Sequence, residues 1–165
     1  MRKLIIAALV LAATCFAQPP EQGWKFYKLD FALKEVEGSK VLNSRNFSTI
    51  VHVDTQGVRA AGGSIRTGSK VPSGPNYIDV GVSIDTQMVK ELQGDVALSV
   101  SAEISSTPDG GNPDRPVIRQ NKWSSYVVVP IKKPTVIFSS DDATTKHAMQ
   151  LELTATPINL GATMK

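Results

Sequence analysis

Cysteine is almost absent from this 165-residue chain, which has a single one, Cys15. It lies in an N-terminal stretch with two basic residues, an apolar run from Leu4 to Ala13, and small residues ending at Ala17. With Ala17 at the −1 position and Cys15 at −3, this order is typical of a secretory signal peptide. The apolar run is too short to span a bilayer. We therefore predict that residues 1–17 are a cleaved signal peptide.

The alternative for this stretch is a lipoprotein signal in which Cys15 carries the lipid. Such signals normally have Gly, Ala or Ser before the cysteine, whereas Thr14 stands here, so the ordinary signal peptide is favoured. The mature chain, residues 18–165, then contains no cysteine, although an exported protein could form disulfides. A domain of this size can be held by its core alone, burying roughly 70% of its unfolded surface.

An excess of charge of one sign is also missing. Removing Arg2 and Lys3 from the 18 basic side chains leaves 16, against 15 acidic ones. No basic block stands out, which argues against nucleic acid as a partner. No later segment is long and apolar enough for a transmembrane helix. We expect an exported protein that is periplasmic, associated with the outer membrane, or extracellular.

Helical periodicity is scarce, and almost every periodic segment alternates with period two. Four stretches place apolar residues on one side and mostly polar or small ones on the other: "LDFALK", "NFSTIVHVD", "DVALSVSAEIS" and "MQLELTAT". "YIDVGVSID", residues 77–85, has the same pattern, and "WSSYVVVP" and "PTVIFSS" add two β-rich runs. A sheet with one apolar face and one solvent-exposed polar face is typical of antiparallel pairing.

The fold expected from this pattern is all-β, an antiparallel sandwich or partial barrel of about eight strands. It forms one domain over residues 24–158, with flexible tails at 18–23 and 159–165. Turn residues gather at "SGPN", 73–76, and in the loop 108–116. Pro130 and Pro134 bracket a predicted hairpin tip with Lys132 and Lys133. The only predicted helical turn is "TQMVKEL", residues 86–92.

Residues for catalysis or metal binding are few. His52 and Asp54 would share one face of a strand, which is half of a metal site, but no second cluster completes a ligand set. Neither Gly-x-Ser-x-Gly nor Ser-x-x-Lys occurs. A hydrolase would require His52 or His147 to meet a Ser and an Asp in a cleft. "SSDDATTK", residues 139–146, is read as a turn rather than a calcium site. We predict no enzyme and no cofactor.

Aromatic residues make up 6% of the chain. Trp24, Trp123 and Tyr126 could stack on a sugar ring if they converged on one exposed face. In a small β domain, Trp is more often found in or beside the core. A carbohydrate- or ligand-binding sandwich is therefore an alternative function.

Read in order, four stretches resemble the C-terminal β core of bacterial secretins. "IRTGSKVPSGPNYIDVGVSIDTQM" is similar to a Gly-x-x-x-Pro segment that leads into a "Y-x-D-V-G-V" strand. "DVALSVSAEISS" resembles the next strand, and "PVIRQNKWSSYVVVPIKKPTVIFSS" the following pair. "MQLELTATPI" resembles the final strand, which closes on Thr-Pro, here Thr156 and Pro157. The similarity runs over roughly residues 62–158.

The chain also departs from that family. It has Ser139, Ser140 and Asp141 where secretins carry Gly-Gly-Leu before a tight hairpin. It lacks the large ring-building modules that precede the core, and it has no obvious amphipathic segment for the outer membrane. The resemblance implies a β architecture and an envelope location.

We therefore expect a non-catalytic, secretin-like envelope protein that binds a protein partner or assembles with itself, with outer-membrane association as a further expectation. Its candidate interaction surface takes residues from the predicted hairpin tip, the long loop, the three aromatic positions and the "YIDVGV" strand. The marked residues are Trp24, Asp109, Asn112, Arg115, Trp123, Tyr126, Lys132 and Lys133.

Overall fold

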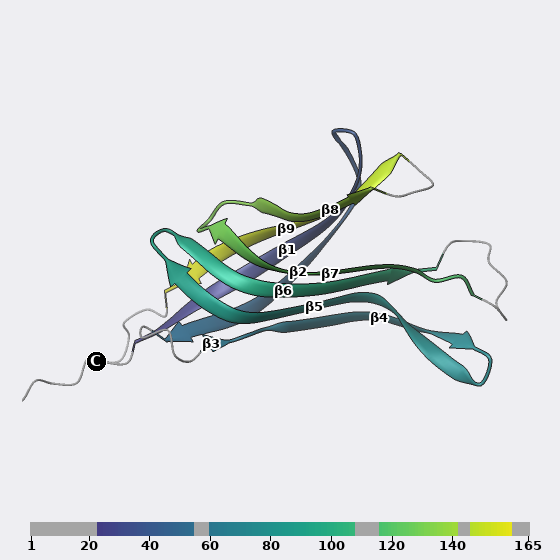
Figure 1. The fold of residues 1–165 in the computed structure, drawn as a ribbon, viewed down its shortest axis with the longest axis horizontal. Coiled ribbons are helices and arrows are strands. Elements are labelled where there is room, and N and C mark those ends of the chain that lie inside the picture. The colour runs from purple at the N-terminus through teal and green to yellow at the C-terminus, as the bar shows by residue number, and fades with distance from the viewer. Residues whose placement is uncertain (1–22, 55–59, 108–115, 142–145, 160–165) are drawn as a thin grey trace, which may run out of the picture.

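Two antiparallel β-sheets make up the part of the protein described by a computed structural model, residues 23–54, 60–107, 116–141 and 146–159. These residues contain nine strands, one of only two residues, and no helix. The five-stranded sheet has the order β3-β2-β1-β9-β8, and the four-stranded sheet the order β4-β5-β6-β7 (Figure 1). The predicted all-β fold is confirmed as an open sandwich rather than a closed barrel. The signal peptide and both tails lie wholly or almost wholly outside the described residues.

The five-stranded sheet is built from the two ends of the chain. Its strands are β1 (Trp24–Glu37), β2 (Lys40–Asp54), β3 (Ala60–Ala61), β8 (Thr135–Asp141) and β9 (His147–Ile158). The four-stranded sheet is a meander formed by the middle of the chain. Its strands are β4 (Ser64–Ser73), β5 (Asn76–Leu92), β6 (Asp95–Ser106) and β7 (Arg119–Pro130).

The core lies between the inner faces of the two sheets. As the alternation predicted, β6 contributes every second residue, and β1 and β9 do the same from the opposite sheet. Leu29 and Phe31 of β1, Leu98 of β6 and Leu153 of β9 are at most 1% exposed. The sandwich is therefore held by apolar burial, in a chain that has no cysteine after residue 15.

The two ends of the sandwich differ. At one end, which we call the closed end, lie the start of β1, the β5–β6 turn and the end of β9. At the other, the open end, the β1–β2 and β4–β5 hairpins project and the sheets splay apart (Figure 1). The predicted turn at residues 73–76 is the tip of the β4–β5 hairpin, where Gly74 has φ +60°.

Pro130 and Pro134 do not bracket a hairpin, so that prediction is wrong. β7 belongs to the four-stranded sheet and β8 to the five-stranded one, and the segment between them crosses from sheet to sheet. The backbone N–H of Ile131 donates to the carbonyl of Gly94 at 3.0 Å, and that of Lys132 donates to the carbonyl of Ala155 at 2.8 Å. The segment thus joins both sheets at the closed end.

The predicted helical turn at 86–92 is also wrong, because these residues continue β5. A β-bulge interrupts the β5–β6 register between Gln87 and Lys90, and Met88 adopts φ +50°. The extra residue shifts the alternation, so that Thr86 and Val89, three apart, both face inward and are buried. Met88 and Leu92, four apart, are both exposed. A bulge in a strand therefore imitates helical spacing.

At Gly81 the four-stranded sheet forks. β5 pairs with β6 only from Val82 onward, whereas its residues 76–81 pair with β4 alone and form a two-stranded arm. Ser105 Oγ accepts a hydrogen bond from the Gly81 N–H at 3.0 Å. A Cβ on Gly81 would lie 2.2 Å from the carbonyl oxygen of Thr67, and its φ is +152°. Glycine is therefore required where the arm leaves the sheet.

Candidate interaction surfaces

The three aromatic residues considered for sugar binding lie on three different surfaces. Trp24, 45% exposed, sits at the closed end with its ring edge-on to His52, 4.6 Å between centroids. Trp123 is half-buried, and its ring lies 5.6 Å from that of Phe138 in the other sheet. Tyr126 faces outward from the four-stranded sheet. The structure does not bring these three side chains together, so they form no common stacking platform.

The other predicted surface residues divide into two groups. Lys132 and Lys133 have exposed side chains, but their backbone forms the sheet-to-sheet crossover, which gives Lys132 a φ of +63°. Asp109, Asn112 and Arg115 lie outside the described residues. Their role in an interaction surface stays a prediction.

The two histidines lie at opposite ends of the molecule. His52 packs against the rings of Trp24 and Phe26 at the closed end. His147 Nδ1 is 2.8 Å from Glu35 Oε1 at the open end. The described residues contain no group of three His, Cys, Asp or Glu side chains that could hold a metal ion. The side chain of Asp54, which the sequence analysis placed on one strand face with His52 without a completed ligand set, lies outside the described part of the structure.

The closed end is fastened by a charged contact between the sheets. Lys25 Nζ of β1 lies 2.8 Å from a Glu91 carboxylate oxygen of β5, and the Tyr27 hydroxyl donates to the same carboxylate. The hydrogen bond from Lys25 lowers the pKa of Glu91, although partial burial acts in the opposite direction. Burial, followed by the bond to Glu91, raises the pKa of Tyr27 well above its ordinary value. Both groups therefore keep their ordinary charge states at neutral pH.

The outer face of the four-stranded sheet is polar, and its charges are matched. Arg66 donates to both carboxylate oxygens of Asp85, at 2.8 and 2.7 Å, which holds the pKa of Asp85 below its usual value. Lys122 pairs with Glu103 at 3.1 Å, and the hydroxyls of Ser101 and Ser124 are 2.8 Å apart. A shallow groove of about 470 Å³ crosses this face where Gly68 and Gly81 lack side chains.

Both edges of the four-stranded sheet are long strands. Among the described residues, β4 has a backbone partner only in β5 and β7 only in β6. β7 has no proline before its last residue, Pro130, and β4 has none before Pro72, next to the hairpin tip. Each strand thus presents one row of N–H and C=O groups that the sheet does not use. Such edges are templates for pairing with another chain.

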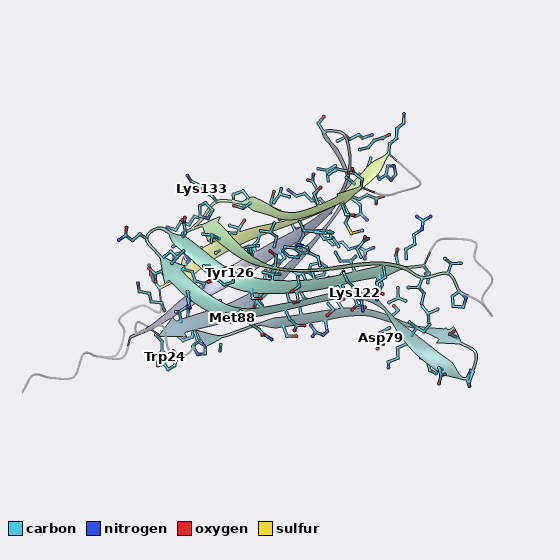
Figure 2. The ribbon with its side chains drawn as sticks, viewed as in Figure 1. Trp24, Asp79, Met88, Lys122, Tyr126 and Lys133 are labelled. Atoms are coloured by element: carbon cyan, nitrogen blue, oxygen red, sulfur yellow. The ribbon has the colours of Figure 1, made fainter. Side chains whose placement is uncertain are left out.

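An apolar patch marks the closed end of the same outer face. It consists of four side chains that are between 45% and 58% exposed: Met88, Leu92, Tyr126 and Val128, which we call the closed-end patch. Met88 and Tyr126 lie at the end of the molecule that also carries Trp24 and Lys133 (Figure 2). The sequence analysis did not mark Met88 and Leu92 as surface residues because it assigned them to a helical turn. The signal in the sequence was that these two apolar residues closely follow the predicted strand at 77–85.

No protein-family model matches the sequence, and no curated protein matches it either. Solved structures of secretins do match, as the sequence resemblance predicted. The type II secretion system secretin GspD of E. coli K12 matches 82% of this chain, with a TM-score of 0.47 and 10% identity. The Salmonella SPI-1 type III secretion injectisome secretin InvG matches 86% of this chain, with a TM-score of 0.47 and 8% identity. The type II secretin XcpQ from Pseudomonas aeruginosa matches 82% of this chain, with a TM-score of 0.44 and 11% identity.

This chain corresponds to 48% of the GspD chain, 66% of the InvG chain and 56% of the XcpQ chain. At these identities the comparison describes a likeness in fold and does not show a function for this chain. Within the described residues, no helix has the length and apolar character needed to cross a membrane.

Proposed function

We propose that this chain is a non-catalytic, secretin-like β domain of the cell envelope that assembles with other copies of itself by strand addition. The observation that carries the proposal is that β4 and β7, the two edge strands of one polar-faced sheet, each pair with only one strand among the described residues. Main-chain hydrogen bonds across such edges supply affinity without a deep pocket. The predicted signal peptide, residues 1–17, supports export to the envelope.

The direction of the strands is compatible with assembly. Neighbouring strands are antiparallel throughout the four-stranded sheet, so its first and last strands, β4 and β7, run in opposite directions. β7 of one copy can therefore pair with β4 of the next and keep the sheet antiparallel. This contact is head-to-tail, because it joins two different edges. Repeated contacts of this kind close into a ring or extend into a filament.

The closed-end patch adds a second element to the proposed function, outer-membrane association. Its four apolar side chains have three exposed lysines in the neighbouring segments: Lys90 in β5, and Lys132 and Lys133 in the crossover. Apolar and aromatic side chains next to lysines are the composition of surfaces that lie at a membrane interface. Detergent should therefore bind to the assembled protein at this end.

The absence of catalysis is likewise part of the proposal. His147 is in contact with Glu35 and His52 with two aromatic rings, so both histidines have a structural environment. The sugar-binding alternative receives no support from its three aromatic residues, which lie on separate surfaces.

The test is the mass of the purified mature chain, residues 18–165, measured by light scattering with and without detergent. We expect a discrete oligomer in at least one of the two conditions. Two adjacent variants locate the interface: Ser124→Pro and Ser125→Pro in β7. In an edge strand, successive backbone N–H groups point alternately to the neighbouring strand and to the outer edge of the sheet. One of the two proline substitutions therefore removes a hydrogen bond from β7 to β6, and the other removes an N–H donor at the outer edge.

The variant that keeps the wild-type melting temperature is the one that removes the outward donor. We expect it to have the mass of a monomer. A wild-type monomer in both conditions would overturn assembly. An oligomer that survives both substitutions would show that the β7 edge is not the interface.

A further inference from the structure

The groove on the outer face of the four-stranded sheet lies next to the β4 edge. Gly68 of β4 and Gly81 of β5 are directly opposite each other in the ladder, and the groove of about 470 Å³ is found where both lack side chains. A Cβ on either glycine would lie 2.2 Å from a carbonyl oxygen of the facing strand. The chain therefore cannot fill the groove with side chains of its own at these two positions.

The backbone groups available at the two edges belong to residues of this same outer face. In β5, the N–H of the inward-facing Thr86 donates to the Gly63 carbonyl, on the β4 side, whereas the N–H of Gly81, at an outward position, donates to Ser105 of β6. These directions alternate along each strand, and neighbouring strands are antiparallel. The outward-facing residues of β4 and β7 therefore direct their N–H and C=O groups to the outer edges of the sheet.

If β7 of one copy adds to β4 of the next, two registers meet the simplest requirements. The ten residues of β4 can all find partners among the twelve of β7 in three registers, and one of these is excluded because it would place inward residues opposite outward ones. The first of the remaining two places Lys122 opposite Lys70. The second, shifted by two residues, places Tyr126 opposite Gly68.

On the outer face, the second register is the favourable one. Like charges directly opposite each other are destabilising, and the first register creates such a contact between Lys122 and Lys70. In the second register, the ring of Tyr126, which is 51% exposed in the single copy, would lie in the groove above Gly68. An aromatic side chain opposite an edge glycine supplies the cross-strand contact that glycine lacks.

The inward-facing residues match in the same register. Trp123 comes to lie opposite Val71, an apolar residue of the arm, and Ser125 lies opposite Ser69. The first register would instead place Trp123 opposite Ser69. The second register gives up one hydrogen bond, because Pro130 has no N–H to donate, but this pair is at the end of the ladder, where bonds open most easily.

We propose that copies of this chain join in the second register, with Tyr126 of one copy packed over Gly68 of the next. The partner is thus a second copy of the chain, and the contact joins the β7 edge of one copy to the groove at the β4 edge of the other. This inference rests on the proposed assembly by strand addition and adds its register and its anchor residue. The rest of the closed-end patch stays on the outer surface for contact with detergent.

Pairs of engineered cysteines measure the register, because the mature chain, residues 18–165, has no cysteine of its own. Ser125→Cys is combined with Ser69→Cys for the proposed register, or with Thr67→Cys for the first one. In the proposed register, residues 125 and 69 form a non-hydrogen-bonded pair with Cα atoms about 4.5 Å apart, which a disulfide can bridge. Within one chain, β4 and β7 are opposite edges of the sheet, so a disulfide forms only between copies.

We expect mild oxidation of the assembled Ser69→Cys/Ser125→Cys protein to give a ladder of covalent multimers on a non-reducing gel. The Thr67→Cys/Ser125→Cys protein should stay mainly uncrosslinked. Ser125→Cys alone should also stay uncrosslinked, because the contact joins two different edges. The mass of each variant before oxidation, from light scattering, shows whether it has assembled.

A second pair of variants tests the anchor. Tyr126→Thr keeps a residue that favours strands but removes the ring, and should raise the dissociation constant between copies about tenfold, as expected for loss of an aromatic anchor. Tyr77→Thr removes a tyrosine that is 69% exposed in the arm and is the matched control. It should associate like the wild type. The concentration dependence of the mass gives both constants.

The inference is overturned if the Thr67→Cys pair crosslinks in place of the Ser69→Cys pair, or if Ser125→Cys crosslinks alone, which would mean that two β7 edges meet. It is also overturned if Tyr126→Thr associates as tightly as Tyr77→Thr. In each of these cases the protein still assembles, so self-assembly stands while its register or anchor does not. A wild-type monomer with and without detergent overturns assembly and this inference together.

Discussion

The closed and the open end of the sandwich are built from many of the same strands, but the two sheets are joined at the closed end and separate at the open end. At the closed end, inward positions such as Tyr27 and Val96 are apolar and at most 2% exposed, and the sheets are joined by Lys25, Glu91 and the crossover. At the open end, the inward positions that follow Leu33 on β1 and Ile104 on β6 are the polar residues Glu35 and Ser106. Alternation along a strand therefore fixes which face a residue belongs to, but not whether another sheet covers that face.

β5 shows this difference within one strand. Val82 and Ile84 are 4% and 0% exposed, whereas Ile78, which belongs to the same apolar stripe, is 37% exposed in the arm. The stripe continues past Gly81, but the facing sheet does not. An apolar side chain therefore contributes to the core only on one side of the fork.

The largest effect should come from Val82→Asp, because it places an unpaired charge at a buried position in the core between the two sheets. We expect a loss of about 3 to 5 kcal/mol in the free energy of unfolding, measured by urea denaturation. Ile78→Asp, four residues away in the arm, is the matched control. It should cost about 1 kcal/mol or less, because its charge stays hydrated. Equal costs at the two positions would mean that the arm is covered in solution.

The fork itself is tested by Gly81→Ala. The added methyl would meet the Thr67 carbonyl oxygen at 2.2 Å and the Gly68 Cα at 2.5 Å, so we expect a loss of about 1 to 3 kcal/mol. Gly74→Ala, at the hairpin tip, also has a positive φ but meets nothing within 4 Å, and should lose only about 1 kcal/mol. Thermal melting of both variants measures the difference. If Gly74→Ala were the more destabilised, the fork would not be the strained point.

The smallest effect is expected for Lys133→Ala at the crossover. The lysine side chain is exposed, and the crossover is held by backbone hydrogen bonds that alanine can also make. The melting temperature should match that of the wild type, since exposed substitutions away from special backbone positions cost at most about 0.5 kcal/mol. A clear loss would mean that this side chain, and not only its backbone, joins the sheets.

Much of the fold could be predicted from the sequence, because alternation is a local property. The inward series on β6, from Val96 to Ile104, was predicted in full and is buried throughout. Pairing between distant strands leaves no such local pattern. For this reason the segment between Pro130 and Pro134 looked like a hairpin, although its flanking strands belong to different sheets. The bulge at Met88 was hidden because one extra residue in a strand gives helical spacing.

The candidate sites were less predictable for a related reason. The free edges depend on strand order, which the alternating pattern does not contain. The long loop with Asp109, Asn112 and Arg115 was marked from its composition, and its role stays a prediction.

The division of the two sheets along the chain has a consequence for the order of folding. The four-stranded meander is complete once residues 64–130 are available, and each of its strands pairs with its sequence neighbour. β1 pairs with β9, so that Phe26 must meet Ile158 near the other end of the chain. Contacts of such long range form slowly. Because the chain is synthesised N-terminus first, the meander can form before β8 and β9 complete the five-stranded sheet, and part of its apolar inner face would stay exposed until the last strand is available.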